Sequence, residues 1–250
     1  MSDSLLPPAE GFGGSYVPPP SPPPPPTTPP RSGFDFVRCF SFVFDDPAWV
    51  RKILLGGVFY LLGFLIVGWF FLLGYGARLT RNVIAGVPRP LPEWDDLGEY
   101  FGEGIKLFLV AFLYALPFLV LGIAVAIPMG MLSNFTRDQD MSNIAGGLVG
   151  CVWCLFAPIV LIVSLWVPAA LLRVIATQDF GAGFQFGAIW RFLKGNAGNY
   201  LLAVVVHLVA GFLAQFGVIL LCVGVIFTAF WSFCVSMYAF AESWRLAPVK

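Results

Sequence analysis

The stretch that decides the fold is residues 200–241, which read YLLAVVVHLVAGFLAQFGVILLCVGVIFTAFWSFCVSMYAFA and contain no Asp, Glu, Lys or Arg. As one helix this run would measure roughly 63 Å at ~1.5 Å per residue, whereas the hydrocarbon core of a bilayer is ~30 Å thick. The chain must therefore turn within the run. Gln215, Phe216 and Gly217 are the best place, because glycine accepts turn conformations and glutamine can reach water. We predict two membrane helices, 200–216 and 218–241.

Three further uncharged runs precede this one, and each exceeds the ~20 residues that a helix needs to cross a bilayer. Prolines lie inside or near the ends of the middle runs, where they are tolerated as kinks if neighbouring groups satisfy the freed carbonyls. The sequence therefore predicts an all-α fold, a polytopic transmembrane bundle of about five membrane helices. The three earlier segments are 53–77, 107–132 and 144–172.

The composition of the whole chain agrees with a membrane location. Of its 250 residues, 58% are hydrophobic and 11% are charged, whereas a soluble domain carries about 25% charged residues. Too few charges are present to cover a water-facing surface of this size. The formal net charge is zero, so the basic bias that nucleic-acid binding needs is missing. We expect the lipid bilayer, and no nucleic acid, among the partners.

The first 33 residues differ in composition from the rest. Residues 18–30 are almost entirely proline, and consecutive prolines favour polyproline II and cannot form helix or sheet. The tail is either a semi-rigid spacer or a ligand for a proline-recognising domain. We therefore divide the chain into a disordered tail, 1–33, and a transmembrane helical domain, 34–250.

The segments between the runs carry amphipathic patterns. Asp96 followed by Glu99 is typical of a capping box, and a stripe that starts at Leu97, Tyr100 and Phe101 recurs at helical spacing. This pattern predicts a short helix that lies at the membrane surface and continues into the second run. Trp94 would anchor its start at the headgroup level. Similar stripes at 36–44 and 186–193 predict two more surface helices.

Basic residues near the membrane predict the orientation. The loop 133–143 holds only Arg137, whereas the other loops and both flanks are richer in Arg and Lys. The loop 133–143 is therefore expected outside, with the loops before and after it in the cytoplasm. If 53–77 crosses fully, the basic N-terminal flank falls outside. If it enters and returns, which its glycines permit, every basic cluster is cytoplasmic. We expect a cytoplasmic N-terminus.

Few residues are candidates for chemistry. His207 is an ionisable residue within an apolar run, so it is either a functional group or a side chain that one hydrogen bond satisfies. Cys151 and Cys154 have C-x-x-C spacing, but in this apolar run we interpret them as packing residues. Acidic residues at 93–103 either bind a divalent cation or solvate the start of a helix, which we favour. We assign no catalytic, cofactor-binding or metal-binding residue and expect no cofactor. The acidic residues are Glu93, Asp95, Asp96, Glu99 and Glu103.

Several loop sequences resemble one known family. They are Asp46-Pro47-Ala48-Trp49, Gly74-Tyr75 with Arg78 and Arg81, residues 91–96 (LPEWDD) and Gly104-Ile105-Lys106, followed by Pro168, Arg173, Phe186 and Asn199-Tyr200. Together they are similar to the Domain of Unknown Function 4013 family of uncharacterised bacterial and archaeal integral membrane proteins, over roughly residues 34–244. The resemblance implies a multi-pass protein of a prokaryotic cytoplasmic membrane. It implies no catalytic or binding residue.

These observations favour a non-enzymatic function. We expect a scaffold, sensor or assembly component with membrane or cytoplasmic protein partners, because surface helices and a tail are available to them. The alternative is a small-solute transporter or channel, since helices interrupted by glycine and proline at mid-membrane are typical of transporters. An intramembrane enzyme is the least favoured, because convergent polar groups are missing from the sequence pattern.

Overall fold

The computed structural model describes residues 33–135, 139–219 and 224–248, and these contain helices and no strand. The chain divides into two units, residues 1–32 and 33–250. The proline-rich tail predicted at 1–33 thus lies, apart from Gly33, outside the described residues. The helices are α1 (Phe36–Ser41), η1 (Phe42–Asp45), α2 (Trp49–Leu62), η2 (Gly63–Leu65), α3 (Val67–Ile84), α4 (Leu97–Phe135), α5 (Gln139–Thr177), η3 (Phe180–Phe184), α6 (Phe186–Gly195), α7 (Ala197–Gln215), η4 (Phe216–Ile219) and α8 (Gly224–Arg245).

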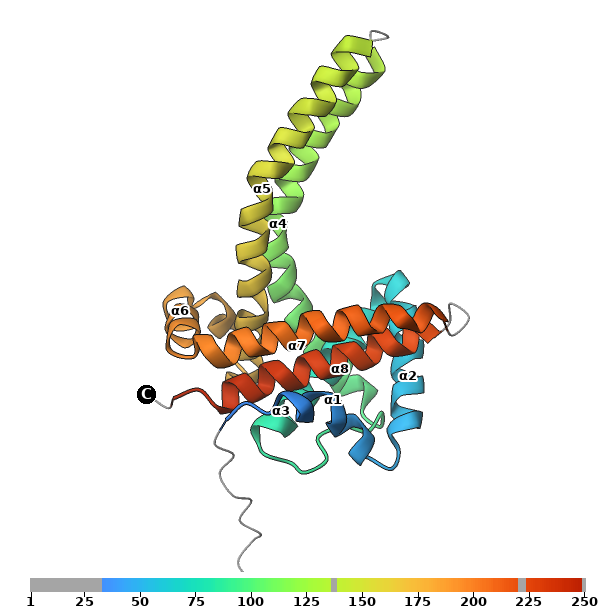
Figure 1. Ribbon diagram of the computed structural model, residues 1–250, viewed down its shortest axis with the longest axis vertical. Coiled ribbons are helices and arrows are strands. Elements are labelled where there is room, and N and C mark those ends of the chain that lie inside the picture. Colours follow the sequence, from blue (N-terminus) through green and yellow to red (C-terminus); the bar gives the residue numbers. More distant parts are fainter. Residues whose placement is uncertain (1–32, 136–138, 220–223, 249–250) are drawn as a thin grey trace, which may run out of the picture. The chain divides into compact units, whose positions relative to one another are not determined.

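The turn predicted within the last apolar run is confirmed. The α7 helix ends at Gln215, the 3₁₀ helix η4 follows, and α8 begins at Gly224. The two helices lie side by side (Figure 1). The Thr228 hydroxyl of α8 donates a hydrogen bond of 2.8 Å to the Ala214 carbonyl of α7. The second helix starts six residues later than predicted, after η4 and after residues 220–223, which lie outside the described residues.

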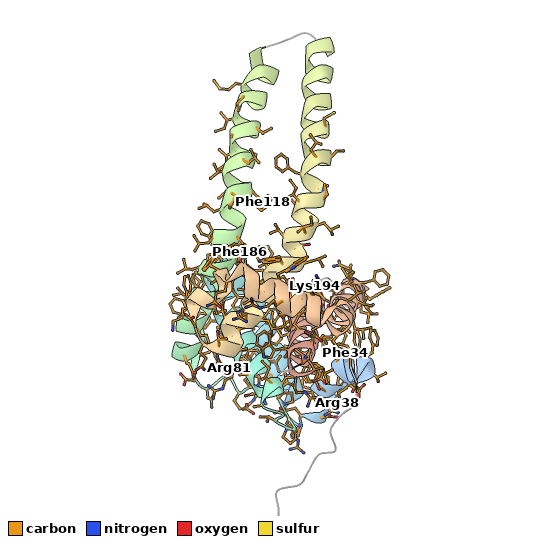
Figure 2. The ribbon with its side chains drawn as sticks, turned by 90° about the vertical axis from the view of Figure 1, so that its left-hand side faces the viewer. Phe34, Arg38, Arg81, Phe118, Phe186 and Lys194 are labelled. Atoms are coloured by element: carbon orange, nitrogen blue, oxygen red, sulfur yellow. The ribbon has the colours of Figure 1, made fainter. Side chains whose placement is uncertain are left out.

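The second and third runs form two long helices that also lie side by side, as both ribbon views show (Figures 1 and 2). Each of α4 and α5 has 39 residues and continues through two prolines. They contain the predicted segments 107–132 and 144–172 and extend beyond both. The surface helix predicted from Leu97 is therefore the first part of α4. The other short helices, α1 and α6, are separate elements, and α6 ends at Gly195.

The first run, 53–77, is interrupted. The α2 helix ends at Leu62, and α3 begins at Val67 after a turn in which Ile66 has φ 64°. The rings of Phe59 and Phe71 have centroids 4.9 Å apart, although twelve residues of straight helix would separate them by roughly 18 Å. The chain therefore folds back on itself. A single straight span over 53–77 is wrong, and the alternative of a run that enters and returns agrees with this hairpin.

The core of the described residues lies around α8. It contacts α2, α3 and α7, and the side chains of Phe230, Cys234 and Val235 are fully buried. Glycines make room for its aromatic rings, since a Cβ on Gly56 or Gly57 would collide with Phe230 or Phe227. An apolar helix with one buried face and small neighbours packs in this way.

Among the described residues, four helices are long and apolar enough to cross a bilayer, judged by length and composition. The bent pair Phe36–Asp45 and Trp49–Leu65, at 101°, raises the number to five if it counts as one broken span. Four or five candidate membrane helices agree with the predicted number of about five, which is thus confirmed. The four are Leu97–Val125, Cys154–Thr177, Ala197–Val218 and Gly224–Arg245.

Candidate functional site

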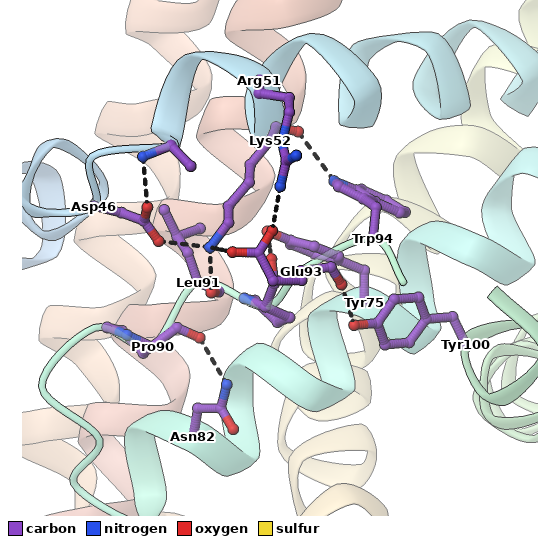
Figure 3. A network of polar contacts seen from close by, with 12 residues as sticks. Asp46, Arg51, Lys52, Tyr75, Asn82, Pro90, Leu91, Glu93, Trp94 and Tyr100 are labelled. Atoms are coloured by element: carbon purple, nitrogen blue, oxygen red, sulfur yellow. Dashed lines mark hydrogen bonds and ion pairs between the residues drawn. The ribbon is translucent and has the colours of Figure 1, made fainter. Parts of the chain in front are cut away.

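A cluster of polar groups surrounds the ammonium group of Lys52, in the first turn of α2 (Figure 3). Lys52 Nζ lies 2.6 Å from Asp46 Oδ2, 2.8 Å from Glu93 Oε1 and 3.0 Å from the Leu91 carbonyl oxygen. Only 3% of the Lys52 side chain is exposed. A lysine ammonium has three N–H donors, and each one has an acceptor here. The cluster therefore joins Lys52 to a loop about forty residues further along the chain.

The two carboxylates of this cluster are held in their charged forms. Burial alone would raise the pKa of Asp46, but hydrogen bonds from Lys52 and the Ala48 N–H bring that pKa below its usual value. The hydrogen bond from Lys52 is the main reason that the pKa of Glu93 is also low, and Arg51 at 2.7 Å from Glu93 Oε2 adds to it. Two carboxylates and the two cations Lys52 and Arg51 form a group without net charge, which suits a structural joint better than proton transfer.

Residues 91–96, here called the LPEWDD loop, are also held by aromatic rings. Trp94 stacks on Phe59 of α2 with ring centroids 4.7 Å apart, and on Tyr75 of α3 at 4.3 Å. Its indole N–H donates to the Lys52 carbonyl at 3.1 Å (Figure 3). The indole thus lies between the two arms of the α2–α3 hairpin. Its ring is partly buried in this stack, and its place at the headgroup level of a membrane stays a prediction.

The carbonyl groups of the same loop receive donors from the helices around it. Tyr75 and Tyr100 donate from their hydroxyls to the carbonyls of Pro92 and Glu93, at 3.2 Å and 2.5 Å. The Asn82 amide donates to the Pro90 carbonyl at 2.9 Å. Satisfied carbonyls allow a loop to lie against helices without water.

Two Arg–Glu pairs connect α3 to the start of α4. Arg78 Nη1 lies 3.0 Å from Glu99 Oε2, and Arg81 contacts both carboxylate oxygens of Glu103, one of them at 2.7 Å. The charged face of the predicted surface helix therefore pairs with α3, and its position at a membrane surface stays a prediction. Tyr100 of the stripe that starts at Leu97 is buried.

Four of the five acidic residues that could have bound a divalent cation have other partners. Glu93, Glu99 and Glu103 each pair with a basic side chain. Asp96 accepts a hydrogen bond of 3.3 Å from the Glu99 N–H, which confirms the predicted N-cap. The reciprocal half of the capping box is replaced, since the Glu99 carboxylate binds Arg78. No group of three metal-binding side chains occurs in the described ranges.

The remaining candidates, His207, Cys151 and Cys154, are far from this cluster in sequence. One of them, His207, has a hydrogen-bond partner. His207 Nδ1 lies 2.8 Å from the Ser236 hydroxyl, which itself donates to the Ser232 carbonyl at 2.8 Å. Because that proton is already used, the imidazole donates from Nδ1 and joins α7 to α8. Cys151 and Cys154 are both exposed on α5.

The sequence pattern does not indicate the role of Lys52, which counts there only as one residue of the basic N-terminal flank. Its partners lie six and 41 positions away, and no local spacing connects positions so far apart. One signal was available, because Asp46 and LPEWDD were both singled out by the resemblance. Two loops that share one family pattern are candidates for contact.

The fold and this cluster define a class, a multi-pass helical membrane protein in which a polar joint holds a helical hairpin. The chain belongs to the family described as protein of unknown function (DUF4013), which matches residues 57–223 and so more than half of the chain. This confirms the resemblance, although the match is shorter than 34–244. It includes the LPEWDD loop and leaves out Asp46 and Lys52. No curated protein and no solved structure matches the chain.

Proposed function

We propose that this protein is a non-enzymatic assembly component of a prokaryotic cytoplasmic membrane, which binds other integral membrane proteins through α4 and α5. The observation that carries the proposal is the exposure of these two helices. In the apolar stretch of α4 that could span a bilayer, 6% of the residues are buried. The corresponding share is 17% for α5 and 56% for α8. Helices with this much free apolar surface need a cover of lipid or protein.

Hydrogen bonds and ring contacts of Tyr114 connect α4 to α5 and to η3. The Tyr114 hydroxyl of α4 donates to the Gly183 carbonyl at 2.6 Å, and the Trp166 indole of α5 donates to the same hydroxyl at 3.3 Å. Tyr114 also stacks on Phe184 with centroids 5.7 Å apart. The hairpin thus starts from a fixed position, which a surface for protein assembly requires.

Two prolines favour protein over lipid as part of the cover. Pro117 and Pro158 have no N–H to give to the carbonyls of Leu113 and Cys154, one turn before each. Hydrocarbon chains cannot donate hydrogen bonds, so a freed carbonyl in a membrane helix is stabilised by a polar group of a neighbouring helix. Both prolines lie on helices with exposed apolar side chains such as Leu116 and Ile159.

The test is photocrosslinking in living cells, with p-benzoylphenylalanine in place of Val120 or Leu161. Val120 is 59% exposed and Leu161 is 62% exposed. We expect discrete adducts with identified integral membrane proteins or with a second, differently tagged copy. The matched control is Leu208 of α7, 64% exposed, where we expect no such adduct. Adducts with lipid alone at Val120 and Leu161 would contradict the proposal.

Small-solute transport is the second candidate, because one observation favours it. A groove of about 460 Å³ lies where α4 begins and α5 ends, and it is lined by charged and apolar groups that include Glu103, Lys106 and Phe180. Solute uptake by vesicles containing the purified protein, lost in Lys106→Ala, would favour transport over assembly.

A further inference from the structure

The charged residues of the α2–α3 hairpin all lie at its open end. Arg51, near the start of α2, pairs with Glu93 at 2.7 Å, and Arg78, near the end of α3, pairs with Glu99 at 3.0 Å. Both acidic partners belong to the connection between α3 and α4 or to the first turn of α4. Lys52 is also held there. The two arms therefore leave from and return to the same polar layer.

The arms are too short to cross a bilayer. Thirteen residues, 53–65, separate Lys52 from Ile66, and eleven residues, 67–77, separate Ile66 from Arg78. At ~1.5 Å per residue these arms measure roughly 16–20 Å, whereas the hydrocarbon core is ~30 Å thick. An arm of this length that entered along the bilayer normal would end beyond the middle of the hydrocarbon and before the opposite interface.

The tip of the hairpin, residues 64–67, is apolar and exposed. Phe64 is 85% exposed, Leu65 69% and Ile66 58%. Loops in water are normally built from Gly, Asn, Asp, Ser and Pro, and four successive apolar residues at a free turn would be an error in a water-facing surface. The composition of this turn instead matches the acyl-chain region of a membrane.

The conformation of Ile66 supports the same environment. Its φ is 64° and its ψ is −38°, a region that a β-branched residue rarely adopts. Glycine would relieve the strain, so the isoleucine side chain must contribute something that glycine cannot. The turn also keeps hydrogen bonds within its backbone, from Ile66 N to Gly63 O at 2.9 Å and from Trp69 N to Ile66 O at 3.0 Å. Such bonds are needed where no water is present.

We propose that α2, η2 and α3 form a re-entrant hairpin, whose tip inserts into the acyl chains of the bilayer and whose two ends stay on one side. The LPEWDD loop and the Lys52 cluster close the open end of the hairpin at the polar layer. Trp94, which stacks on both arms, holds them together as they leave that layer. This proposal concerns other helices than the assembly surface on α4 and α5, so either can fail alone.

The experiment places a reporter at the tip in the full-length chain. Cys151, Cys154 and Cys222 are replaced by alanine, and the buried Cys39 and Cys234 are kept. Phe64→Cys is then labelled with an environment-sensitive fluorophore, and the protein is reconstituted into phosphatidylethanolamine–phosphatidylglycerol vesicles. We expect stronger quenching by a nitroxide deep in the acyl chain than by a nitroxide on the headgroup.

The same variant, unlabelled, is then exposed to a membrane-impermeant maleimide from each side. We expect Phe64→Cys to react at least about tenfold more slowly than the control Arg89→Cys, because thiolates do not form in hydrocarbon. Arg89 is exposed in the connection after α3. Rapid labelling from the side opposite to Arg89 would mean that the hairpin crosses. Labelling of Phe64→Cys from the same side as Arg89→Cys and at a similar rate would also overturn the proposal. So would a tip that is neither labelled nor quenched by the deep nitroxide.

Discussion

At the scale of single residues, Lys52 explains why the LPEWDD loop lies against α2. Removing one partner of a buried ion pair leaves an uncompensated charge, which costs about 3–5 kcal/mol. In Lys52→Met the Asp46 carboxylate loses its cation although only 8% of its side chain is exposed. We therefore expect the free energy of unfolding to fall by about 3 kcal/mol, measured by denaturant titration of the detergent-solubilised protein.

The matched control for that substitution is Arg51→Met. Arg51 binds the same Glu93, but 69% of its side chain is exposed. Exposed pairs contribute about 0–1 kcal/mol, so the expected loss is small. Equal losses in the two variants would show that the burial of Lys52 is not what stabilises the joint.

The same carboxylates predict how stability depends on pH. The pKa values of Asp46 and Glu93 lie below their usual values in the folded chain. Groups with depressed pKa values stabilise the fold above their unfolded pKa and lose that contribution as the pH falls through the folded one. We expect the midpoint temperature of thermal unfolding to fall when the pH is lowered below about 4. In Lys52→Met, burial without the cation raises the pKa of Asp46. The stability of this variant should therefore fall, and not rise, as the pH increases toward that pKa.

Glycine positions illustrate what sequence spacing can and cannot predict at this scale. Gly146 and Gly150 have the small-xxx-small spacing, but nothing lies within 4 Å of a Cβ at either position. Close approach occurs instead at Gly74 and Gly104, where an added Cβ would collide with the backbone of the facing helix. Spacing shows which glycines share a face, whereas only the packing shows which face meets another helix.

At the scale of elements, the contact of α3 with α4 depends on those glycines. A Cβ on Gly104 would collide with the Phe70 carbonyl of α3, and the rings of Phe70 and Phe101 meet there with centroids 5.5 Å apart. We expect Gly104→Ala to destabilise the protein by about 1–3 kcal/mol, because inserted atoms force the backbones apart. The measurement is the same denaturant titration.

Gly102→Ala is the control on the same helix. Nothing lies within 4 Å of a Cβ at Gly102, and alanine is a better helix former than glycine by about 1 kcal/mol. The free energy of unfolding should therefore stay equal or rise slightly. A comparable loss in both variants would mean that α3 and α4 do not depend on close packing at Gly104.

The helices themselves were largely predictable from the sequence. Uncharged runs indicated the apolar parts of α4, α5, α7 and α8, because membrane helices are defined by length and composition. The length of the last run required a turn, and Gln215 and Gly217 indicated its place. The fold-back at Ile66 was less predictable. Glycines in 53–77 permitted a bend, but the turn occurs at an isoleucine with positive φ, which no turn rule selects.

At the scale of the whole molecule, the sequence predicted the class and the family but not the polar joint. Lys52 and Glu93 are 41 positions apart, and Trp94 contacts Phe59 and Tyr75 from a third segment. Such contacts are properties of the folded chain, because helix periods relate only residues within a few turns. The acidic residues therefore looked like a solvated helix start, although three of them pair with cations of other helices.

The central claim of this account is that α4 and α5 cross the bilayer from the polar layer around Lys52. The most direct measurement is the reaction of a membrane-impermeant maleimide with single cysteines in intact and opened cells, in the variant that keeps only the buried Cys39 and Cys234. Asn134→Cys, at the end of α4, should react in intact cells, and Arg89→Cys only after opening. Reaction of both positions under the same condition would mean that α4 does not cross, and would contradict the account.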